Sequence, residues 1–247
     1  MKYEETSWFS TRVNRNMNIK IYGHYGIPII LFPSFNKDNT EFCDGGMIDA
    51  IADYINDGKV KLFCLQSNDS ETVASTSWDN NQRAYLLDQY FEYLINEVLP
   101  FVYDKNGGYC LPLVSGVSMG ASHAAIAFFR RPDLFMGILG LSGGYDVAHF
   151  FNGYMNENIY NNSPTAFLEN MDKNHNYINI YNSKKMIFVC GQGNFEHLVL
   201  YSNYWLRDIL NYKSINAWFD ILDNNNIHDW SSWNRQMHHY LQFFINN

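Results

Sequence analysis

Residues 111–131 read LPLVSGVSMGASHAAIAFFRR, in which a short apolar run, a Gly-x-Ser-x-Gly pentapeptide and a helix-like run follow one another. The apolar run is typical of a buried strand, and residues 119–130 are typical of a helix. The pentapeptide Gly116-Val117-Ser118-Met119-Gly120 therefore lies at a strand-to-helix turn, where a serine hydroxyl is presented at the carboxyl edge of a parallel sheet. This context makes Ser118 a candidate nucleophile.

On both sides of this turn, short apolar runs alternate with longer amphipathic stretches. Such alternation is typical of strands joined by crossover helices, and it predicts an α/β fold with a mostly parallel central sheet flanked by helices. Strands are expected at residues 18–22, 27–32, 60–65, 113–115, 137–142, 186–190 and 217–222. Helices are expected at residues 46–56, 80–102, 119–130, 196–211 and 230–245.

Residues 145–184 break this rhythm, because they are aromatic and rich in Asn without a strong apolar run or a sustained helical period. A segment of this kind is predicted to form a small lid-like insertion over the edge or top of the sheet. Its aromatic side chains could line a pocket for an aromatic ester or a carbohydrate, or else pack in the core: Tyr145, Phe150, Phe151, Tyr154 and Tyr160. No internal repeat or linker is visible, so residues 1–247 are predicted to form a single domain.

The composition disfavours several classes of function. The chain of 247 residues has 17 Lys+Arg against 25 Asp+Glu and a formal net charge of −8, which argues against nucleic-acid binding. No apolar stretch reaches the length of a membrane span and the N-terminus lacks the apolar core of a signal peptide, so a cytoplasmic protein without membrane attachment is predicted. Free thiols are expected at the four cysteines, which lack metal-ligand spacing: Cys43, Cys64, Cys110 and Cys190.

A serine nucleophile needs a base, and His228 is the candidate. In this architecture the expected chain order is Ser, then an acid after a later strand, then His after the last strand. Of the eight histidines, only His228 lies in a turn-rich loop between the final expected strand and the final expected helix. His123, on the same expected helix as Ser118, could line the site or pack beneath it. Surface or turn roles are expected for His24, His149, His175, His197, His238 and His239.

The acid of the site is less clear from the sequence. After the strand at 186–190 comes Gly191-Gln192-Gly193-Asn194-Phe195-Glu196, and Asn194 stands where many hydrolases of this architecture carry Asp. An amide can orient an imidazole, but it cannot stabilise an imidazolium by charge. Glu196 has the longer side chain that could reach His228, and it is the preferred acid. Asp223 and Asp220, near the last expected strand, are the alternatives, and a site without a working acid remains open.

An oxyanion hole requires two N–H donors. The backbone N–H of Met119, at the start of the helix after Ser118, is the first. The second is expected from the loop after the strand at 27–32, and the N–H of Phe35 is preferred, with Ser34 next. An ordinary turn at the strand end is the alternative for this loop.

These residues resemble the putative esterase family within the α/β-hydrolases, a group that includes S-formylglutathione hydrolase (esterase D), feruloyl and acetyl esterases and mycolyltransferases. The matching segments span residues 27–245: LFPSF at 31–35, SWDNNQRAYLLDQYFEYLINEVLPFV at 77–102, GVSMGASHA at 116–124, LSGGYD at 141–146 and IHDWSSWNRQMHHYLQFF at 227–244. The sequence is most similar to a branch of small intracellular esterases with a G-Q-G-x-[aromatic]-E segment, and that likeness implies Glu196 as the acid. Two positions depart from the usual pattern, since Pro33-Ser34 replaces His-Gly and Asn194 replaces Asp.

The resemblance implies an α/β-hydrolase fold and a serine carboxylesterase that works through an acyl-enzyme with no cofactor and no metal. The expected partner is a small-molecule ester, and aromatic side chains exposed on the lid would favour a homodimer. Hydrolysis of a thioester and acyl transfer to an alcohol share the same acyl-enzyme, so they remain alternatives. A binding protein that has lost turnover is a third possibility, suggested by Asn194.

Overall fold

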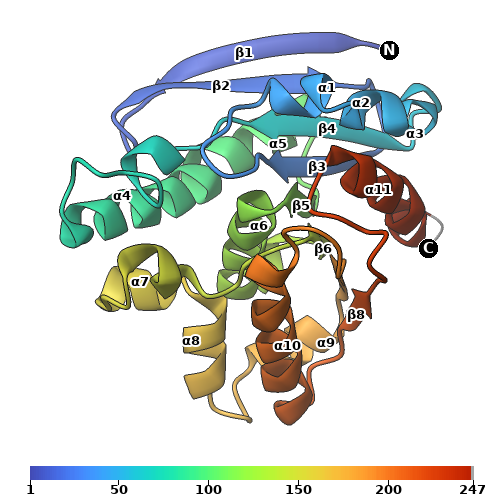
Figure 1. Ribbon diagram of the computed structural model, residues 1–247. Helices are drawn as coiled ribbons and strands as arrows, with labels where there is room; N and C mark the ends of the chain where they lie inside the picture. The colour runs from blue at the N-terminus through green and yellow to red at the C-terminus, as the bar shows by residue number, and fades with distance from the viewer. Residues whose placement is uncertain (246–247) are drawn as a thin grey trace.

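The computed structural model describes residues 1–245 of the chain. They contain an eight-stranded sheet in the order β1-β2-β4-β3-β5-β6-β7-β8 (Figure 1). The six neighbouring strands β4-β3-β5-β6-β7-β8 run parallel to one another, whereas β2 is antiparallel to both of its neighbours, β1 and β4. The strands are β1 (Tyr3–Ser10), β2 (Arg15–Tyr22), β3 (Ile27–Phe32), β4 (Val60–Leu65), β5 (Leu113–Val117), β6 (Gly137–Leu141), β7 (Lys185–Cys190) and β8 (Trp218–Ile221). The predicted mostly parallel sheet is therefore confirmed.

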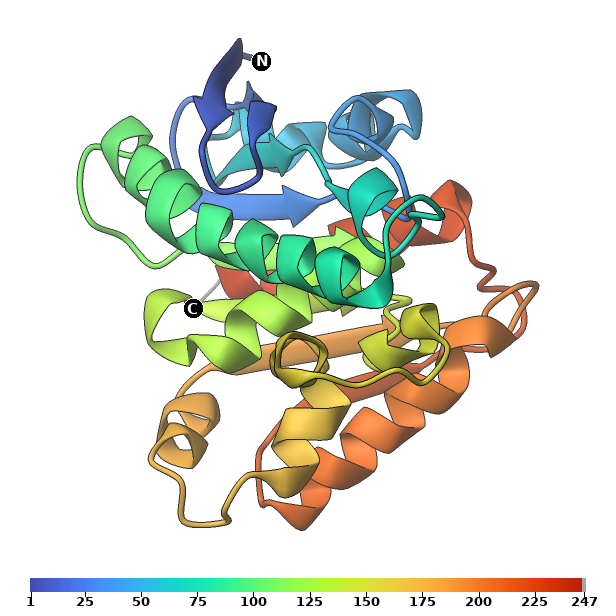
Figure 2. The same ribbon diagram turned by 90° about the vertical axis from the view of Figure 1, so that its left-hand side faces the viewer.

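Helices cover both faces of the sheet. On one face, seen in Figure 2, lie α4 (Asn80–Tyr93), α5 (Leu99–Lys105), α6 (Met119–Arg130), α7 (Glu157–Asn161), α8 (Pro164–Asn170), α9 (Tyr177–Asn182) and α10 (His197–Tyr212). On the other lie α1 (Glu41–Asp44), α2 (Met47–Ala50), α3 (Ala52–Asn56) and α11 (Trp230–Ile245). Within residues 1–245, none of the helices combines the length and apolar character needed to cross a membrane.

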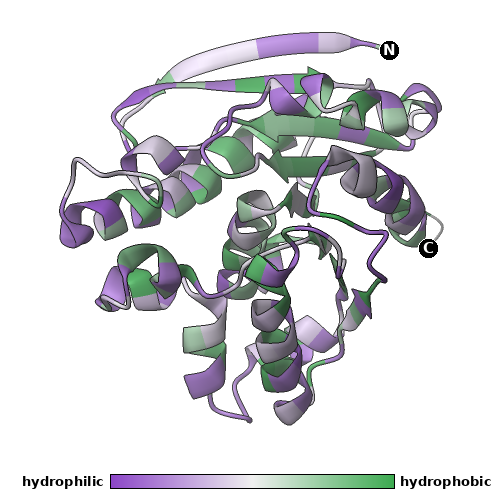
Figure 3. Cartoon of the chain, viewed as in Figure 1, coloured by the Kyte–Doolittle hydropathy of each residue, from purple (hydrophilic) through white to green (hydrophobic). Residues whose placement is uncertain are grey.

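The core is divided by the sheet into two apolar layers, because successive side chains of a strand point to opposite faces. In β3, Ile30 and Phe32 belong to the apolar layer that includes side chains of α4, α6 and α10, whereas Ile29 and Leu31 belong to the layer that includes side chains of α2 and α11. Every residue of β4, β5 and β6 is buried, as expected for strands covered on both faces. In Figure 3, most of β3 and β4 is drawn in green, the colour of hydrophobic residues.

The strands expected from the sequence are all present, and β3 and β4 match the expected residues. The sequence pattern does not predict β1, whose residues YEETSWFS mix charged and aromatic side chains. This strand is the edge of the sheet, and its alternate side chains are exposed to solvent, so it needs no continuous apolar run. In Figure 3 it is drawn mostly in white and purple.

One helical prediction is wrong in part, and another helix extends beyond its expected end. The helix expected over 46–56 is wrong as a single element, because the backbone leaves the helical region at Ile51 and separates α2 from α3. The helix expected over 80–102 is confirmed and continues to Lys105 through the π-helical turn η2 (Leu94–Val98). Pro100 follows that turn, and a wider turn accommodates a residue that cannot donate a helical hydrogen bond.

Residues 145–184 contain η4 (Val147–Phe151) and the short helices α7, α8 and α9. In this segment, α7 contacts α4 and α8 contacts α10, so most of it extends the helical layer on one face of the sheet. Only η4 reaches the carboxyl ends of the parallel strands, where it borders the cavity described below.

The parallel strands end in register at one edge of the sheet. The last residue of β5, Val117, pairs with Leu141 of β6, and Leu141 pairs with Val189 of β7. The chain then leaves each strand at the same level, since the N–H of Ser118 donates to Leu141 and the N–H of Ser142 donates to Val189. Loops from strands that are far apart in the sequence therefore meet at this edge, as expected for a parallel sheet.

Candidate active site

Ser118 occupies a sharp turn between β5 and α6. Its backbone has φ 55° and ψ −122°, a conformation that non-glycine residues rarely adopt and that costs about 1–3 kcal/mol. The turn is held by the N–H of Ser118, which donates to the carbonyl of Leu141 at 2.8 Å. This conformation raises the hydroxyl above the edge of the sheet, at the N-terminus of the twelve-residue helix α6.

The two glycines of the pentapeptide allow this turn to pack against β3. A Cβ atom added to Gly120 would lie 1.9 Å from the carbonyl oxygen of Phe32, and one added to Gly116 would lie 2.4 Å from the carbonyl carbon of Gly120. Neither distance is compatible with a side chain. The sequence pattern thus reflects close backbone approach at both positions.

His228 lies beside the serine. Its Nε2 is 2.8 Å from the hydroxyl oxygen of Ser118, so that nitrogen can accept the hydroxyl proton. The backbone N–H of His228 donates to the carbonyl of Asn194, and the imidazole packs edge to face on Trp233, with ring centroids 5.0 Å apart. The loop after β7 and the first turn of α11 thus fix the ring from two sides.

Glu196 lies on the other side of the imidazole. Its Oε2 is 3.3 Å from Nδ1 of His228, and the carboxylate is fully buried. Burial by itself would raise the pKa of Glu196, but hydrogen bonds from His228 and Ser142 outweigh it and hold the pKa below its ordinary value. The carboxyl group therefore stays ionised and is able to orient the imidazole and to stabilise its protonated form.

Further polar side chains support this carboxylate, and the sequence reasoning missed them. The hydroxyl of Ser142 donates to Oε1 of Glu196 at 2.6 Å, and the indole N–H of Trp233 donates to the Ser142 oxygen at 3.0 Å. The thiol of Cys190 lies 3.4 Å from Oε2 of Glu196. Ser142 directly follows β6, and this position after a buried strand is the sequence signal that could have marked it.

The loop after β3 brings a backbone donor to the same place. Within residues 1–245, the N–H groups of Phe35 and Met119 have no hydrogen-bond acceptor, and both residues line the cavity at Ser118. The N–H of Ser34, the second choice from the sequence, is instead bound by the carboxylate of Glu41. The N–H groups of Phe35 and Met119 are therefore available as donors at this cavity.

A cavity of about 240 Å³ opens beside Ser118 and His228. Its other lining residues are mostly apolar and come from the loop after β3, the start of α6, the loop after β6, η4 and the start of α10: Phe35, Met119, Ser122, Gly144, His149, Phe150, Leu198 and Val199. The rings of Phe35 and Phe150 stack with centroids 5.8 Å apart. Of the aromatic residues that the sequence offered for a pocket, Phe150 lines the cavity, whereas Tyr145 and Phe151 are fully buried in the core.

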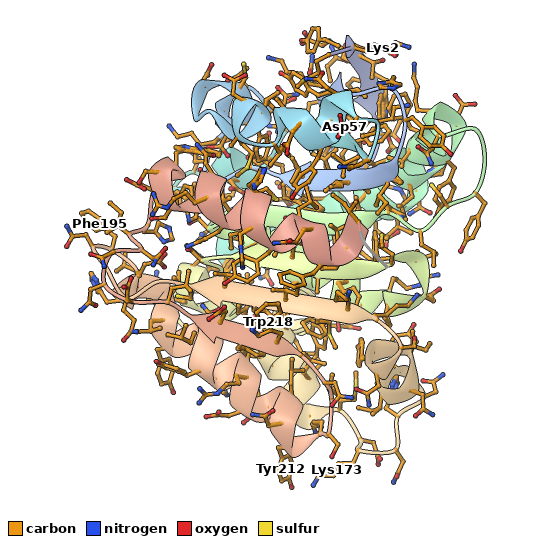
Figure 4. All side chains as sticks on the ribbon, turned by 90° about the vertical axis from the view of Figure 1, so that its right-hand side faces the viewer. Lys2, Asp57, Lys173, Phe195, Tyr212 and Trp218 are labelled. Carbon is orange, nitrogen blue, oxygen red and sulfur yellow. The ribbon has the colours of Figure 1, made fainter. Side chains whose placement is uncertain are left out.

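The other acid candidates lie away from the imidazole. Asp220 accepts a hydrogen bond from the hydroxyl of Tyr240, and the exposed Asp223 binds Asn225 and Asn226 of its own loop. The side chain of Asn194 is exposed. Figure 4 shows its neighbour Phe195 at the outer rim of the molecule. Glu196 is the one of these candidates that the structure brings to His228.

The remaining histidines take structural or surface positions. His123 is buried, and its Nε2 lies 2.9 Å from the carboxylate of Asp69. His238 pairs with Asp53 on the surface, and His149 is an exposed residue at the edge of the cavity. Residues 1–245 contain no group of three or more His, Cys, Asp or Glu side chains arranged to hold a metal ion.

Comparison with known proteins places this geometry in context. The model of the family described as "Putative esterase" matches residues 10–244. No curated protein matches the chain significantly in sequence.

Solved structures share the fold over almost the whole chain. A ferulic acid esterase matches with a TM-score of 0.77 and 15% identity, covering 99% of this chain and 98% of the other. An S-formylglutathione hydrolase from Agrobacterium tumefaciens matches with a TM-score of 0.74 and 10% identity, covering 99% and 94%. One from Staphylococcus aureus matches with a TM-score of 0.70 and 15% identity, covering 99% and 96%. At these identities the likeness shows the α/β-hydrolase fold, as predicted.

Proposed function

The chain belongs to the putative esterase family, and we propose that it is a serine carboxylesterase that cleaves small acyl esters through an acyl-enzyme on Ser118. One observation carries the proposal. Ser118, His228 and Glu196 form a continuous hydrogen-bonded row, with 2.8 Å between hydroxyl and imidazole and 3.3 Å between imidazole and carboxylate. A row of nucleophile, base and orienting acid next to a cavity is the arrangement that acyl transfer requires.

In the proposed reaction, the Ser118 oxygen attacks the ester carbonyl while Nε2 of His228 takes the hydroxyl proton. The N–H groups of Met119 and Phe35 donate to the carbonyl oxygen as it becomes negatively charged. His228 then gives its proton to the departing alkoxide, which leaves as an alcohol. Water repeats the sequence on the acyl-enzyme, with His228 again as the base, and the acid is released.

The cavity supports a small acyl group as the preferred substrate. Its volume of about 240 Å³ is below the roughly 300–1,000 Å³ typical of pockets for drug-sized ligands. Apart from Ser118 and His228, the lining consists mainly of Phe, Leu, Val, Met and Gly, and no Asp, Glu, Lys or Arg contributes to it. An uncharged acyl chain of modest length fits both the size and the polarity of this space.

The experiment compares hydrolysis of p-nitrophenyl acetate and butyrate by the wild-type protein and by Ser118→Ala, His228→Ala and Glu196→Gln. We expect the first two variants to lose activity by about 10⁴-fold or more, and Glu196→Gln to keep weak residual activity. A fluorophosphonate should modify Ser118 in the wild-type protein, as mapped by mass spectrometry. Full activity of Ser118→Ala, or an adduct on another residue, would refute the proposal.

Two related activities are tested by the same assay. Thioester hydrolysis and acyl transfer to an alcohol use the same acyl-enzyme, and they are distinguished by comparing matched thioester and oxygen-ester substrates and by adding an alcohol acceptor. Asn194 suggested a binding protein without turnover, because the position lacks a carboxylate. The carboxylate of Glu196 beside His228 supports turnover instead. A protein that forms the adduct on Ser118 but never releases an acyl group would favour the binding protein.

A further inference from the structure

Two buried carboxylates hold the loop after β3 on either side of Phe35. The N–H and the hydroxyl of Ser34 both donate to Glu41, the hydroxyl over 2.7 Å to Oε2. The N–H of Asn36 donates to Oδ2 of Asp69 at 3.0 Å. The N–H groups of Ser34 and Asn36, on either side of Phe35, are therefore bound within the protein. Of these three consecutive N–H groups, that of Phe35 is the one without an acceptor among residues 1–245.

The backbone conformation agrees with this arrangement. Asn36 has φ 56°, in the left-handed region, which turns the chain sharply just after Phe35. Such a conformation is unfavourable for a residue with a side chain and persists where surrounding contacts enforce it. The hydrogen bond from the Asn36 N–H to Asp69 is one such contact.

Asp69 also joins this loop to the helix that carries the nucleophile. The residue is fully buried at the start of η1 (Asp69–Glu71), in the loop after β4. Its second oxygen, Oδ1, lies 2.9 Å from Nε2 of His123, a buried residue of α6. One carboxylate thus connects the loop of the Phe35 donor with the helix whose first N–H, at Met119, is the other donor.

We infer that Asp69 and Glu41 are positioning residues for the oxyanion hole, because together they set where the N–H of Phe35 lies relative to that of Met119. This inference rests on the proposed esterase function. Two carboxylates near a developing oxyanion would oppose its negative charge, so their contribution is geometric. An amide in either place can keep the hydrogen bonds, since its oxygen accepts from the backbone N–H. Its nitrogen donates to the hydroxyl oxygen of Ser34 in Glu41→Gln and, in Asp69→Asn, to Nε2 of His123 in the tautomer that carries its proton on Nδ1.

The test compares Asp69→Ala and Glu41→Ala with the amide variants Asp69→Asn and Glu41→Gln. Misplacing a donor by about 1 Å lowers turnover by roughly 10²-fold, so each alanine variant should lose about 10- to 100-fold in kcat, with KM changed by less than about threefold. The amide variants should keep kcat within about threefold of the wild-type protein. A trifluoromethyl ketone, whose adduct with Ser118 carries an oxyanion, should bind the alanine variants more weakly in the same proportion as kcat falls.

The matched control is Glu97→Ala. Glu97 also accepts two hydrogen bonds, from the indole N–H of Trp8 and the hydroxyl of Ser10, but it connects β1 to η2 at the edge of the sheet. Its loss should lower the melting temperature and leave kcat and ketone affinity unchanged at a temperature where the protein is folded. If Asp69→Ala does not fold, Glu41→Ala and the two amide variants carry the comparison.

The outcomes separate the two proposals. A wild-type protein that hydrolyses no ester and binds no ketone would refute the esterase function. A wild-type protein that does both, with alanine variants that match it in kcat and ketone affinity, would refute only the positioning role. Amide variants that lose as much activity as the alanine variants would also refute it, because the geometry would then not be what matters.

Discussion

At the scale of single residues, Glu196 combines complete burial with an ionised carboxyl group. It can do so because Ser142, His228 and Cys190 surround its two oxygens with donors. Removing a buried carboxylate from water is unfavourable, and hydrogen bonds to charged groups compensate for that. The acid of the site is thus stabilised by donors from β7 and from the loops after β6 and β8, and it does not depend on His228 alone.

This environment predicts a pH dependence of stability. The pKa of Glu196 is lowered from the ordinary 4.5 by His228 and Ser142, against the opposing effect of burial. Because the folded protein binds this proton more weakly than the unfolded chain, the stabilisation is complete above pH 4.5 and is lost as the pH falls through the lower folded-state pKa. The melting temperature of the wild-type protein should exceed that of Glu196→Gln most at neutral pH.

The measurement is the melting temperature of both proteins from about pH 7 to about pH 3, with the difference between them plotted against pH. The difference should shrink below pH 4.5. Ser118→Ala serves as the control, because it keeps Glu196 and should follow the pH dependence of the wild-type protein. A difference that stays constant over the whole range would contradict the lowered pKa.

Asn194 illustrates how a motif position can mislead. Its side chain is exposed, and only its backbone carbonyl contacts His228. We therefore expect Asn194→Asp and Asn194→Ala to change kcat/KM by no more than about twofold, as is usual for exposed side chains. Steady-state kinetics on the same ester substrates test this, and a tenfold gain for Asn194→Asp would contradict it by showing that a carboxylate at this position contributes to the reaction.

At the scale of elements, the junction of β5 and α6 depends on backbone contact with β3. A methyl group at Gly120 would meet the carbonyl oxygen of Phe32 at 1.9 Å, and that oxygen belongs to a buried central strand. We expect Gly120→Ala to cost more than about 4 kcal/mol of unfolding free energy or to prevent folding. Urea unfolding followed by circular dichroism, or the soluble yield, measures the effect.

Gly144→Ala is the matched control for this substitution. A Cβ atom at Gly144 meets Val199 at an ordinary 3.6 Å, and its backbone is not in the left-handed region. The loss of stability should stay below about 1 kcal/mol. Equal stability losses for the two variants would show that close approach is not the reason for glycine at position 120.

The elements that the sequence predicts are those with a local signal. β3 is a continuous apolar run, β4 is apolar apart from Lys61, and α6 and α11 have the expected bounds. In contrast, β1 is an edge strand with one exposed side, and the short helices between residues 145 and 184 are too brief for a helical period to emerge. Their formation depends on tertiary packing that no local pattern encodes.

The same distinction applies to the site. Ser118 and His228 could be predicted from the sequence, because each lies at a position that chain order and turn composition define. Glu196 could be predicted because its side chain is long enough to reach His228. Asp69 and Glu41 could not be predicted from the sequence. Their importance comes from hydrogen bonds to a loop elsewhere in the sequence, and nothing in their own neighbourhoods points to Phe35.

At the scale of the whole molecule, the four free thiols differ in solvent exposure, and their reactivity should differ accordingly. Cys43 is exposed and Cys110 is half-buried, whereas Cys64 and Cys190 are buried. Burial raises the pKa of the Cys64 and Cys190 thiols, and Glu196 raises that of Cys190 further, which disfavours the reactive thiolate. A chromogenic aryl disulfide should therefore modify Cys43 rapidly, Cys110 slowly, and the other two only after denaturation.

The control for this prediction is Cys43→Ser, which should remove the fast phase and leave the rest of the time course unchanged. Rapid modification of Cys190 in the native protein would be the contradictory result. Since its thiol faces the carboxylate of Glu196, such modification would mean that the region beneath the site opens to solvent.

The loop after β3 has a consequence for how the protein can evolve. At Phe35, the main chain and the side chain have separate tasks: the N–H, which has no acceptor among residues 1–245, is the proposed donor, while the ring stacks on Phe150, and both residues line the cavity. Because flanking carboxylates hold the main chain, the ring can be exchanged without moving the donor. Selection is then free to alter substrate preference at this position while the reaction chemistry is inherited intact. Proline is the one replacement that this separation forbids, because it has no N–H to donate.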